Sequence, residues 1–360
     1  MHFSPEVKMS ITNIEWTDRV WNPVTGCQKV SPGCKHCYAE GVAHRFWATQ
    51  YPAVEVETGG PAGTLSRSRK FTDVMTHEDR LLEPLRWKKP AKVFVNSMSD
   101  LFHEDVPNGF IDEVFATMAA GHRHTYQVLT KRPERMRAYM SAADLEERIH
   151  WASLNRFGHT PDFDPSVDSW TTGRWPLPNV WLGVSVEDQE RADERIPLLL
   201  QTPAAVRFVS AEPLLGPVDF GKANGLPVFR WADKPIDSFD GLSGRHLGTH
   251  AELAGRWQRH DVNTRRWLDW VIVGGESGPG ARPCHEAWVR SIVQQCQAAG
   301  TPVFVKQLGA FPIWSLSDGR PANGEGGTAK AARTVAGALN PKCADPSEWP
   351  EDLRVREFPR

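Results

Sequence analysis

Short apolar runs recur along the chain, and most of them end in a cluster of polar residues. The runs are rich in β-branched side chains, which is typical of strands covered on both faces in a parallel sheet. The pattern predicts strands within residues 92–100, 126–132, 180–187, 206–213, 270–278 and 302–309, with a further strand near residues 20–24.

Helical periodicity lies between these runs. A first helix is predicted after Pro107 and before Gly121, and a second one before Gly300. Their apolar faces consist of Ile111, Val114, Phe115 and Met118 in the first helix, and Val289, Ile292, Val293 and Cys296 in the second. The alternation of strands and helices predicts an α/β protein built from right-handed βαβ units.

Two intervals between the predicted strands are longer than a bare strand–helix unit needs. We expect them to hold insertions at about residues 145–178 and 221–268, which show no clear hydrophobic period and suit lids or substrate-facing segments. Residues 310–345 are rich in Gly, Ala and Pro and are expected to form a loop-rich extension. The whole of residues 1–360 is interpreted as one domain.

The composition is that of a soluble globular protein, with 40% hydrophobic and 24% charged residues. No apolar run approaches the roughly 20 residues that cross a bilayer, and the first residues lack the features of a signal peptide. We therefore expect a cytoplasmic protein without a membrane partner, whose start is either Met1 or Met9. The net charge of −2 excludes a molecule that attracts nucleic acid with its whole surface.

Three of the six cysteines lie close together as Cys27-x6-Cys34-x2-Cys37, and the others are scattered. In a cytosolic protein this distribution does not indicate a disulfide framework. Gly and Pro residues permit a tight loop around the three cysteines, and a helix is predicted from residue 38 to 49. Three thiolates on a loop after the first strand can hold three irons of a [4Fe–4S] cluster.

The fourth iron of such a cluster stays open, so that S-adenosylmethionine (SAM) can chelate it through its amino and carboxylate groups. An electron from the cluster then cleaves the sulfonium and leaves a 5′-deoxyadenosyl radical. A zinc knuckle is the main alternative, but zinc normally takes four protein ligands. His36 is poorly placed to be the fourth, so His44 or Cys284 would have to be recruited. Buried or redox-active cysteines are a third interpretation.

Polar residues follow each predicted strand. Ligands bind at the carboxyl ends of parallel strands, so we expect a polar ring on the same rim as the cysteines. Lys131, Arg132 or Lys306 could bind the SAM carboxylate, and acidic members could bind its amino group and ribose. For any one residue, a surface ion pair or a helix cap is an equal alternative. The candidate SAM-binding residues are Asn96, Ser99, Asp100, Lys131, Ser185, Glu187, Glu212, Glu276 and Lys306.

Basic residues also gather locally, within residues 67–70, 86–89 and 256–266. Trp257 and Trp267 accompany the last group, which could grip a nucleic-acid strand. A solvated charged surface is the alternative interpretation.

The sequence resembles the phage- and prophage-associated three-Cys-motif proteins, a radical-SAM-like family. The resemblance implies a partial (βα)6-type parallel barrel, with Cys27, Cys34 and Cys37 on the cluster loop after the first strand. Two features depart from the usual radical SAM pattern: six residues separate the first two cysteines instead of three, and residues 96–100 stand where Gly-Gly-Glu is common. The segments that carry the resemblance are IEWTDRVWNPVTGC, SPGCKHCYAE, NSMSDLFHEDVP, VLTKRPERM, WLGVSVE, SAEPLLGP, VIVGGESGPGARP, FVKQLG and EWPEDLRVREFP.

The hypothesis from sequence is therefore an enzyme that uses a [4Fe–4S] cluster and SAM. Its expected partners are a flavodoxin- or ferredoxin-type reductant, a separate partner protein, and a nucleobase or nucleotide substrate, for example in phage DNA. The alternative from another class is a non-catalytic zinc- or cluster-binding protein that binds nucleic acid or acts as a regulator.

Overall fold

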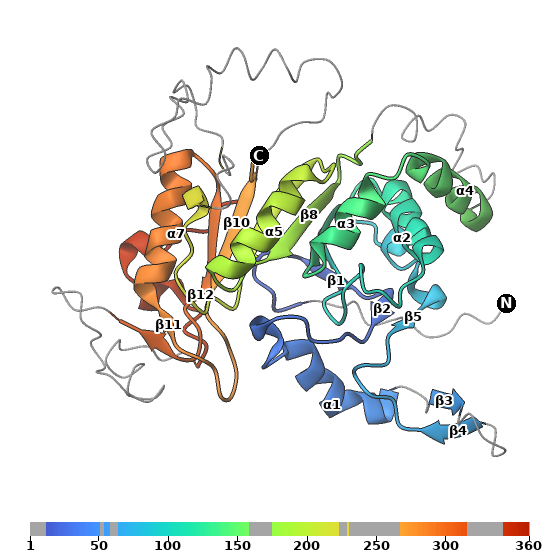
Figure 1. Cartoon of the computed structure of the whole chain (residues 1–360), viewed down its shortest axis with the longest axis horizontal. Coiled ribbons are helices and arrows are strands. Elements are labelled where there is room, and N and C mark those ends of the chain that lie inside the picture. The colour runs from blue at the N-terminus through green and yellow to red at the C-terminus, as the bar shows by residue number, and fades with distance from the viewer. Residues whose placement is uncertain are drawn as a thin grey trace, which may run out of the picture.

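The structure is a computed structural model that describes residues 12–50, 54–57, 64–157, 175–222, 229, 267–314 and 341–359. Its centre is a seven-stranded sheet, curved into a half-barrel, in which all neighbouring strands are parallel (Figure 1). The order across the sheet is β1 (Arg19–Trp21), β6 (Lys92–Val95), β7 (Thr125–Thr130), β8 (Val180–Ser185), β9 (Val206–Ala211), β10 (Trp270–Gly274) and β12 (Val303–Gln307).

The predicted parallel α/β sheet is thus confirmed. Each of the six apolar runs contains one strand, and the polar clusters that end the runs lie just beyond the strands. The run near residues 20–24 divides between two sheets: β1 joins the half-barrel, while β2 (Val24–Thr25) pairs antiparallel with β5 (Met75–Thr76).

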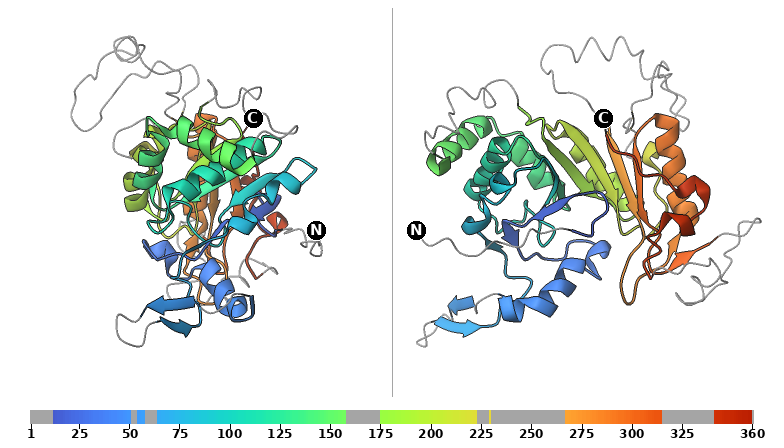
Figure 2. Two further views of the ribbon diagram at one scale, coloured as in Figure 1. Left: turned by 90° about the vertical axis from the view of Figure 1, so that its right-hand side faces the viewer. Right: turned by 180° about the vertical axis from the view of Figure 1, so that it is seen from behind.

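Helices pack on the convex face of the sheet, whereas α1 lies apart, near the carboxyl ends of the strands (Figures 1 and 2). Both helices predicted from periodicity are present, and Gly300 ends the second one in the left-handed conformation that glycine favours, with φ of 65°. The helices are α1 (Tyr38–Gln50), α2 (Asn108–Ala120), α3 (Pro133–Met140), α4 (Leu145–Phe157), α5 (Gln189–Gln201) and α7 (Glu286–Ala299).

Shorter elements complete the described residues. β3 (Val54–Glu57) pairs antiparallel with β4 (Thr64–Arg67), and β11 (Cys284–His285) pairs parallel with β13 (Pro312–Ile313). The 3₁₀ turns are η1 (Pro32–Cys34), η2 (Glu78–Arg80), η3 (Pro84–Arg86), η4 (Phe220–Lys222), η5 (Pro346–Glu348) and η6 (Glu351–Leu353). No helix among the described residues is long and apolar enough to span a membrane.

The first predicted insertion begins with α4, whose buried Leu145 and Ile149 join the main core beside α2. This part of the chain therefore belongs to the helical layer and is not a lid over the strand ends. Residues 158–174, nearly all of the second predicted insertion (221–268) and most of residues 310–345 lie outside the described residues.

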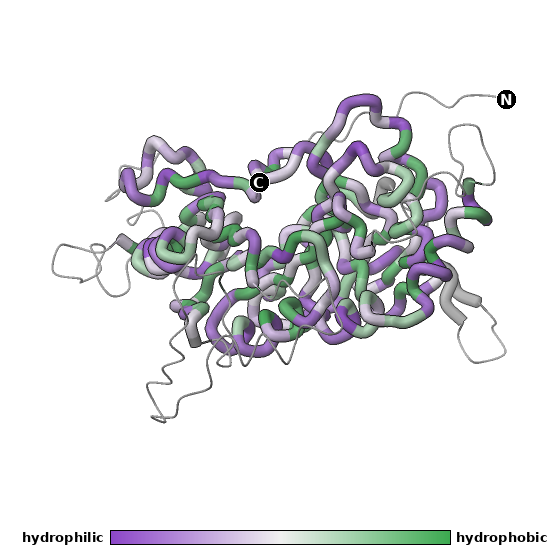
Figure 3. Tube along the Cα trace, turned by 90° about the horizontal axis from the view of Figure 1, so that it is seen from above, coloured by the Kyte–Doolittle hydropathy of each residue, from purple (hydrophilic) through white to green (hydrophobic). Residues whose placement is uncertain are grey.

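The two faces of the sheet carry separate cores. Val209 and Val271 pack under the helices, while Phe208, Trp270 and Phe304 belong to a second, aromatic cluster on the concave face. Hydrophobic and hydrophilic stretches alternate along the described parts of the chain (Figure 3). Since successive side chains of a strand point to opposite faces, Ser210, two positions after Phe208, and Lys306, two positions after Phe304, also face the concave side. The half-barrel is thus apolar near the amino ends of its strands and polar near their carboxyl ends.

Gly183 of β8 tests the packing of the concave face. A Cβ at this position would come within 2.6 Å of the Phe208 ring. We expect Gly183→Ala to lower the free energy of unfolding by about 1–3 kcal/mol, because the ring has to move in a packed core. Urea denaturation measures the change. Gly109→Ala in α2 is the control, since a Cβ there meets no atom within 4 Å; equal stabilities of the two variants would contradict the packing described.

Candidate cluster site at the carboxyl ends of the strands

The three clustered cysteines lie on residues 26–37, here called the cysteine loop, which connects β2 with α1 through η1. The loop begins at Gly26, whose φ of 94° suits glycine and whose missing side chain leaves room for the Asp73 carbonyl oxygen. Gly26 also bridges to Ser99 beyond β6, and the Cys27 amide donates to the Phe71 carbonyl. The start of the loop is therefore fixed by backbone contacts.

The cysteines of the loop are partly exposed, while Cys284, Cys296 and Cys343 are buried. Cys27 and Cys37 pack against one small apolar cluster. Burial, with a smaller contribution from Asp100, raises the pKa of Cys27 to about 12, and burial raises the pKa of Cys37. Thiols of this kind become thiolates when a bound metal supplies positive charge. The set offers three soft sulfur donors, which is the ligand chemistry of an iron–sulfur cluster.

The residues considered as a fourth zinc ligand have other contacts. The His36 imidazole lies 3.1 Å from Glu276, and His44 lies 4.0 Å from Glu40 on α1. Cys284 is in the core, where burial and nearby Cys343 raise its pKa to about 12. Within the described part of the chain, no group of three or more His, Cys, Asp or Glu side chains is arranged to hold a metal ion, and this includes Cys27, Cys34 and Cys37.

Three side chains near the ends of β7, β8 and β10 hold the cysteine loop together with their partners, and these contacts are here called clamps. Arg132, which follows β7, forms the first clamp. Its Nη1 lies 3.7 Å from the Cys27 sulfur, and its Nη2 donates to the Gln28 carbonyl over 3.5 Å. Asp100 and Glu104 hold the guanidinium at 3.2 and 2.9 Å. The loop is thereby tied to the end of β7.

Glu187, which follows β8 and is fully buried, forms the second clamp. It accepts a hydrogen bond of 2.8 Å from the Ser31 hydroxyl of the cysteine loop. Lys131 and Arg195 lie 3.2 and 3.3 Å from its carboxylate. Burial opposes ionisation of Glu187, but Lys131 and Arg195 outweigh it and lower the pKa of Glu187. The charged carboxylate is therefore stabilised inside the protein.

Glu276, which follows β10, forms the third clamp together with Arg282. Arg282 donates to the carboxylate from Nε and Nη2 at 2.9 and 2.6 Å, and from Nη1 to the Pro32 carbonyl at 2.8 Å. His36 of the loop lies beside the same carboxylate. Burial opposes the charge of Glu276, but the hydrogen bonds from Arg282 and His36 outweigh it and lower the pKa of Glu276.

Other members of the predicted ring also bind protein atoms. Asn96, with φ of 61°, accepts from the Val24 amide, and Ser99 donates to the Val24 carbonyl, so both hold β2. Asp100 accepts from the Thr130 hydroxyl at 2.7 Å besides Arg132. Ser185 is buried, and its carbonyl accepts from Arg195. The ring predicted to bind SAM thus contains several residues that shape the loop.

Four members of the predicted ring are only partly buried: Ser99, Lys131, Glu212 and Lys306. Lys306 pairs with Glu212 at 2.7 Å, as Lys131 does with Glu187. Partly buried Leu129 and Trp181 lie on the concave face near the aromatic cluster. The lysines and Glu212 offer two ammonium groups and a carboxylate at the carboxyl ends of the strands, which suit a ligand that carries an anionic group.

Sequence reasoning missed four members of the clamps: Ser31, Glu104, Arg195 and Arg282. Arg195 is on α5 and Arg282 is in a loop, and nothing in their local sequence marks them. Ser31 stands inside the cysteine motif and could have been found as a loop anchor.

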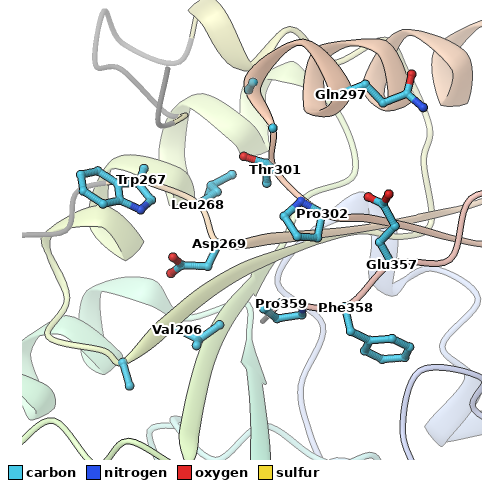
Figure 4. Close-up of a pocket in the computed structure, with 13 residues that line it drawn as sticks. Val206, Trp267, Leu268, Asp269, Gln297, Thr301, Pro302, Glu357, Phe358 and Pro359 are labelled. Carbon is cyan, nitrogen blue, oxygen red and sulfur yellow. The ribbon is translucent and has the colours of Figure 1, made fainter. Parts of the chain in front are cut away.

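A separate cavity of about 820 Å³ lies at the other end of the sheet (Figure 4). Its lining includes Val206, which begins β9, and Asp269 and Pro302, which immediately precede β10 and β12. The cavity is therefore at the amino ends of the strands, away from the cysteine loop.

Comparison with known proteins gives one match. The profile of the family described as "Protein of unknown function (DUF5131)" matches residues 11–338. No curated protein and no solved structure matches the chain.

The second clamp is tested by Glu187→Gln, which removes the negative charge and leaves Lys131 and Arg195 without it. Because the group is buried, we expect the free energy of unfolding of the metal-free protein to fall by roughly 3–5 kcal/mol. Glu190→Gln on the surface of α5 is the control, with an expected change below about 0.5 kcal/mol. Urea denaturation measures both, and a Glu187→Gln variant as stable as the wild type would show that the clamp contributes nothing.

The depressed pKa values of Glu187 and Glu276 predict loss of stability in acid. Because the pKa of each is lower in the folded than in the unfolded state, their stabilisation is complete above about pH 4.3 and disappears as the pH falls through the folded values. Unfolding free energies of the metal-free protein between neutral and acidic pH measure this loss. Glu187→Gln should show a shallower decline, and an unchanged slope would refute the prediction.

Proposed function

The chain belongs to the DUF5131 family, and because this family has no assigned function, we propose one from the site: a radical SAM-like enzyme with a [4Fe–4S] cluster on Cys27, Cys34 and Cys37. The observation that carries the proposal is the position of the cysteine loop. Three clamps, from the residues that follow β7, β8 and β10, hold the loop at the carboxyl ends of a parallel half-barrel. This is the end at which parallel βα proteins bind their ligands.

Different residues of the protein would hold the cluster, position the loop and bind SAM. The three thiolates hold the cluster, and the clamps keep the loop in place. Lys131 or Lys306 binds the carboxylate of SAM, and Glu212 binds its amino group or a ribose hydroxyl. When bound, the cluster and SAM supply a 5′-deoxyadenosyl radical.

The proposal extends to partners and location. One cluster needs an external one-electron donor, for which a flavodoxin- or ferredoxin-type protein is suitable. The substrate in this proposal is a nucleobase or nucleotide, for example in phage DNA, and the ammonium groups of Lys131 and Lys306 suit a phosphate. The resemblance to phage-associated three-Cys-motif proteins adds a separate partner protein, and the free thiols suit the reducing cytoplasm.

SAM turnover tests the function. The protein is purified and reconstituted with iron and sulfide without oxygen, then mixed with dithionite and SAM, and 5′-deoxyadenosine is quantified. We expect product from the wild type, and the loss of both cluster absorbance and product from a variant with Cys27, Cys34 and Cys37 changed to Ala. Cys296→Ala is the matched control, because this buried cysteine of α7 lies outside the loop and its variant should retain both.

Two outcomes would contradict the proposal. A fully loaded cluster that yields no 5′-deoxyadenosine would refute the use of SAM. One zinc ion per chain and no iron after anaerobic purification would favour the non-catalytic alternative.

A further inference from the structure

Arg132 is the cationic side chain that contacts a sulfur atom of the cysteine loop. Its Nη1 lies 3.7 Å from the Cys27 Sγ, within hydrogen-bond range for a sulfur acceptor. The side chain is only 10% exposed, so water competes little for this contact. A guanidinium presents its N–H groups in a rigid plane, and the direction of one bond therefore fixes the others.

The neighbours of Arg132 fix its orientation. Nε binds Glu104, Nη1 binds Asp100 as well as the sulfur, and Nη2 binds the Gln28 carbonyl. Asp100 is itself held by the Thr130 hydroxyl at 2.7 Å and the Lys131 amide at 3.0 Å. The backbone of Arg132 is tied as well, since its amide donates to the Thr130 hydroxyl. The N–H group that points to Cys27 is therefore preorganised.

We propose that Arg132 is a positioning residue that donates a hydrogen bond to the Cys27 sulfur and thereby raises the reduction potential of the cluster; this rests on the proposed function. Reduction adds one electron from an external donor and breaks no bond to the protein. Arg132 keeps its proton throughout and interacts more strongly with the more negative, reduced state. Hydrogen bonds to cluster sulfurs are a known determinant of the potential of iron–sulfur proteins.

Asp100 makes the effect of Arg132 on the reduction potential of the cluster larger. Its carboxylate is close enough to raise the pKa of Cys27, so its negative charge also acts on the sulfur. In the wild type, Arg132 lies against this carboxylate and offsets it. Without the guanidinium, Asp100 would disfavour addition of an electron.

The experiment is a redox titration of the anaerobically reconstituted full chain, followed by electron paramagnetic resonance. Arg132→Gln removes the positive charge and keeps an N–H donor. Arg132→Lys keeps the charge and removes the planar array of guanidinium N–H groups. At a fixed potential we expect Arg132→Gln to lower the ratio of reduced to oxidised cluster about tenfold, equivalent to about 59 mV for one electron. Arg132→Lys should give a ratio between those of the wild type and Arg132→Gln. It replaces Arg132→Gln in the test if the Gln variant takes up little iron.

Arg282→Lys is the matched control. Arg282 also grips the cysteine loop, but at the Pro32 carbonyl and not at a sulfur. Its variant should therefore keep the wild-type potential. Iron and sulfide are measured in every sample, so that incomplete clusters are not mistaken for a shift.

The outcomes separate this inference from the proposed function. Equal potentials for wild type and both Arg132 variants, at equal iron content, would overturn the role of Arg132 alone. A shift in Arg282→Lys as large as that in Arg132→Gln would also overturn it, because loosening of the loop would then explain both. A wild-type protein that binds no iron would overturn the proposed function and the inference together.

Discussion

The attachment of the cysteine loop to the sheet is the constraint on which the rest of the site depends. The loop is short, and side chains that follow three strands of the sheet hold it in place. Two of these groups are the carboxylates of Glu187 and Glu276, which are ionised although buried, because arginine or lysine lies beside each. A buried ion pair contributes little net stability, but it defines one geometry, since a misplaced partner leaves a charge without compensation.

The concave face of the half-barrel has an apolar part and a polar part. Aromatic side chains fill the half-barrel near the amino ends of its strands and exclude water there. Near the carboxyl ends, the inward positions carry charged residues, of which some hold the loop and others remain partly exposed. Lys131, Glu212 and Lys306 lie at this end, and Lys131 shares its partner Glu187 with Ser31 of the cysteine loop. The fold thus brings three thiols and these charged residues to one rim.

Much of this arrangement could be predicted from the sequence, because it depends on local patterns. The apolar runs predicted the strands, the apolar periodicity around Ile111 and Val289 predicted α2 and α7, and the parallel order placed the polar clusters on one rim. The clamps could not be predicted, because they join residues far apart in the chain: Ser31 bonds to Glu187 over 156 positions, and Arg282 to Pro32 over 250. Sequence alone also could not tell that Asp100 and Glu187 are occupied by arginine and lysine partners. Local patterns give the position of a polar residue along a strand, whereas its partner depends on the tertiary structure.

Mössbauer spectroscopy of the anaerobically iron-loaded protein, with and without SAM, tests the central claim most directly. If three thiolates leave one corner of the cluster open, addition of SAM should change the signal of a single iron site and leave the others as they were. A spectrum that SAM does not alter, from a cluster that is fully assembled, would contradict an open corner and with it the radical chemistry.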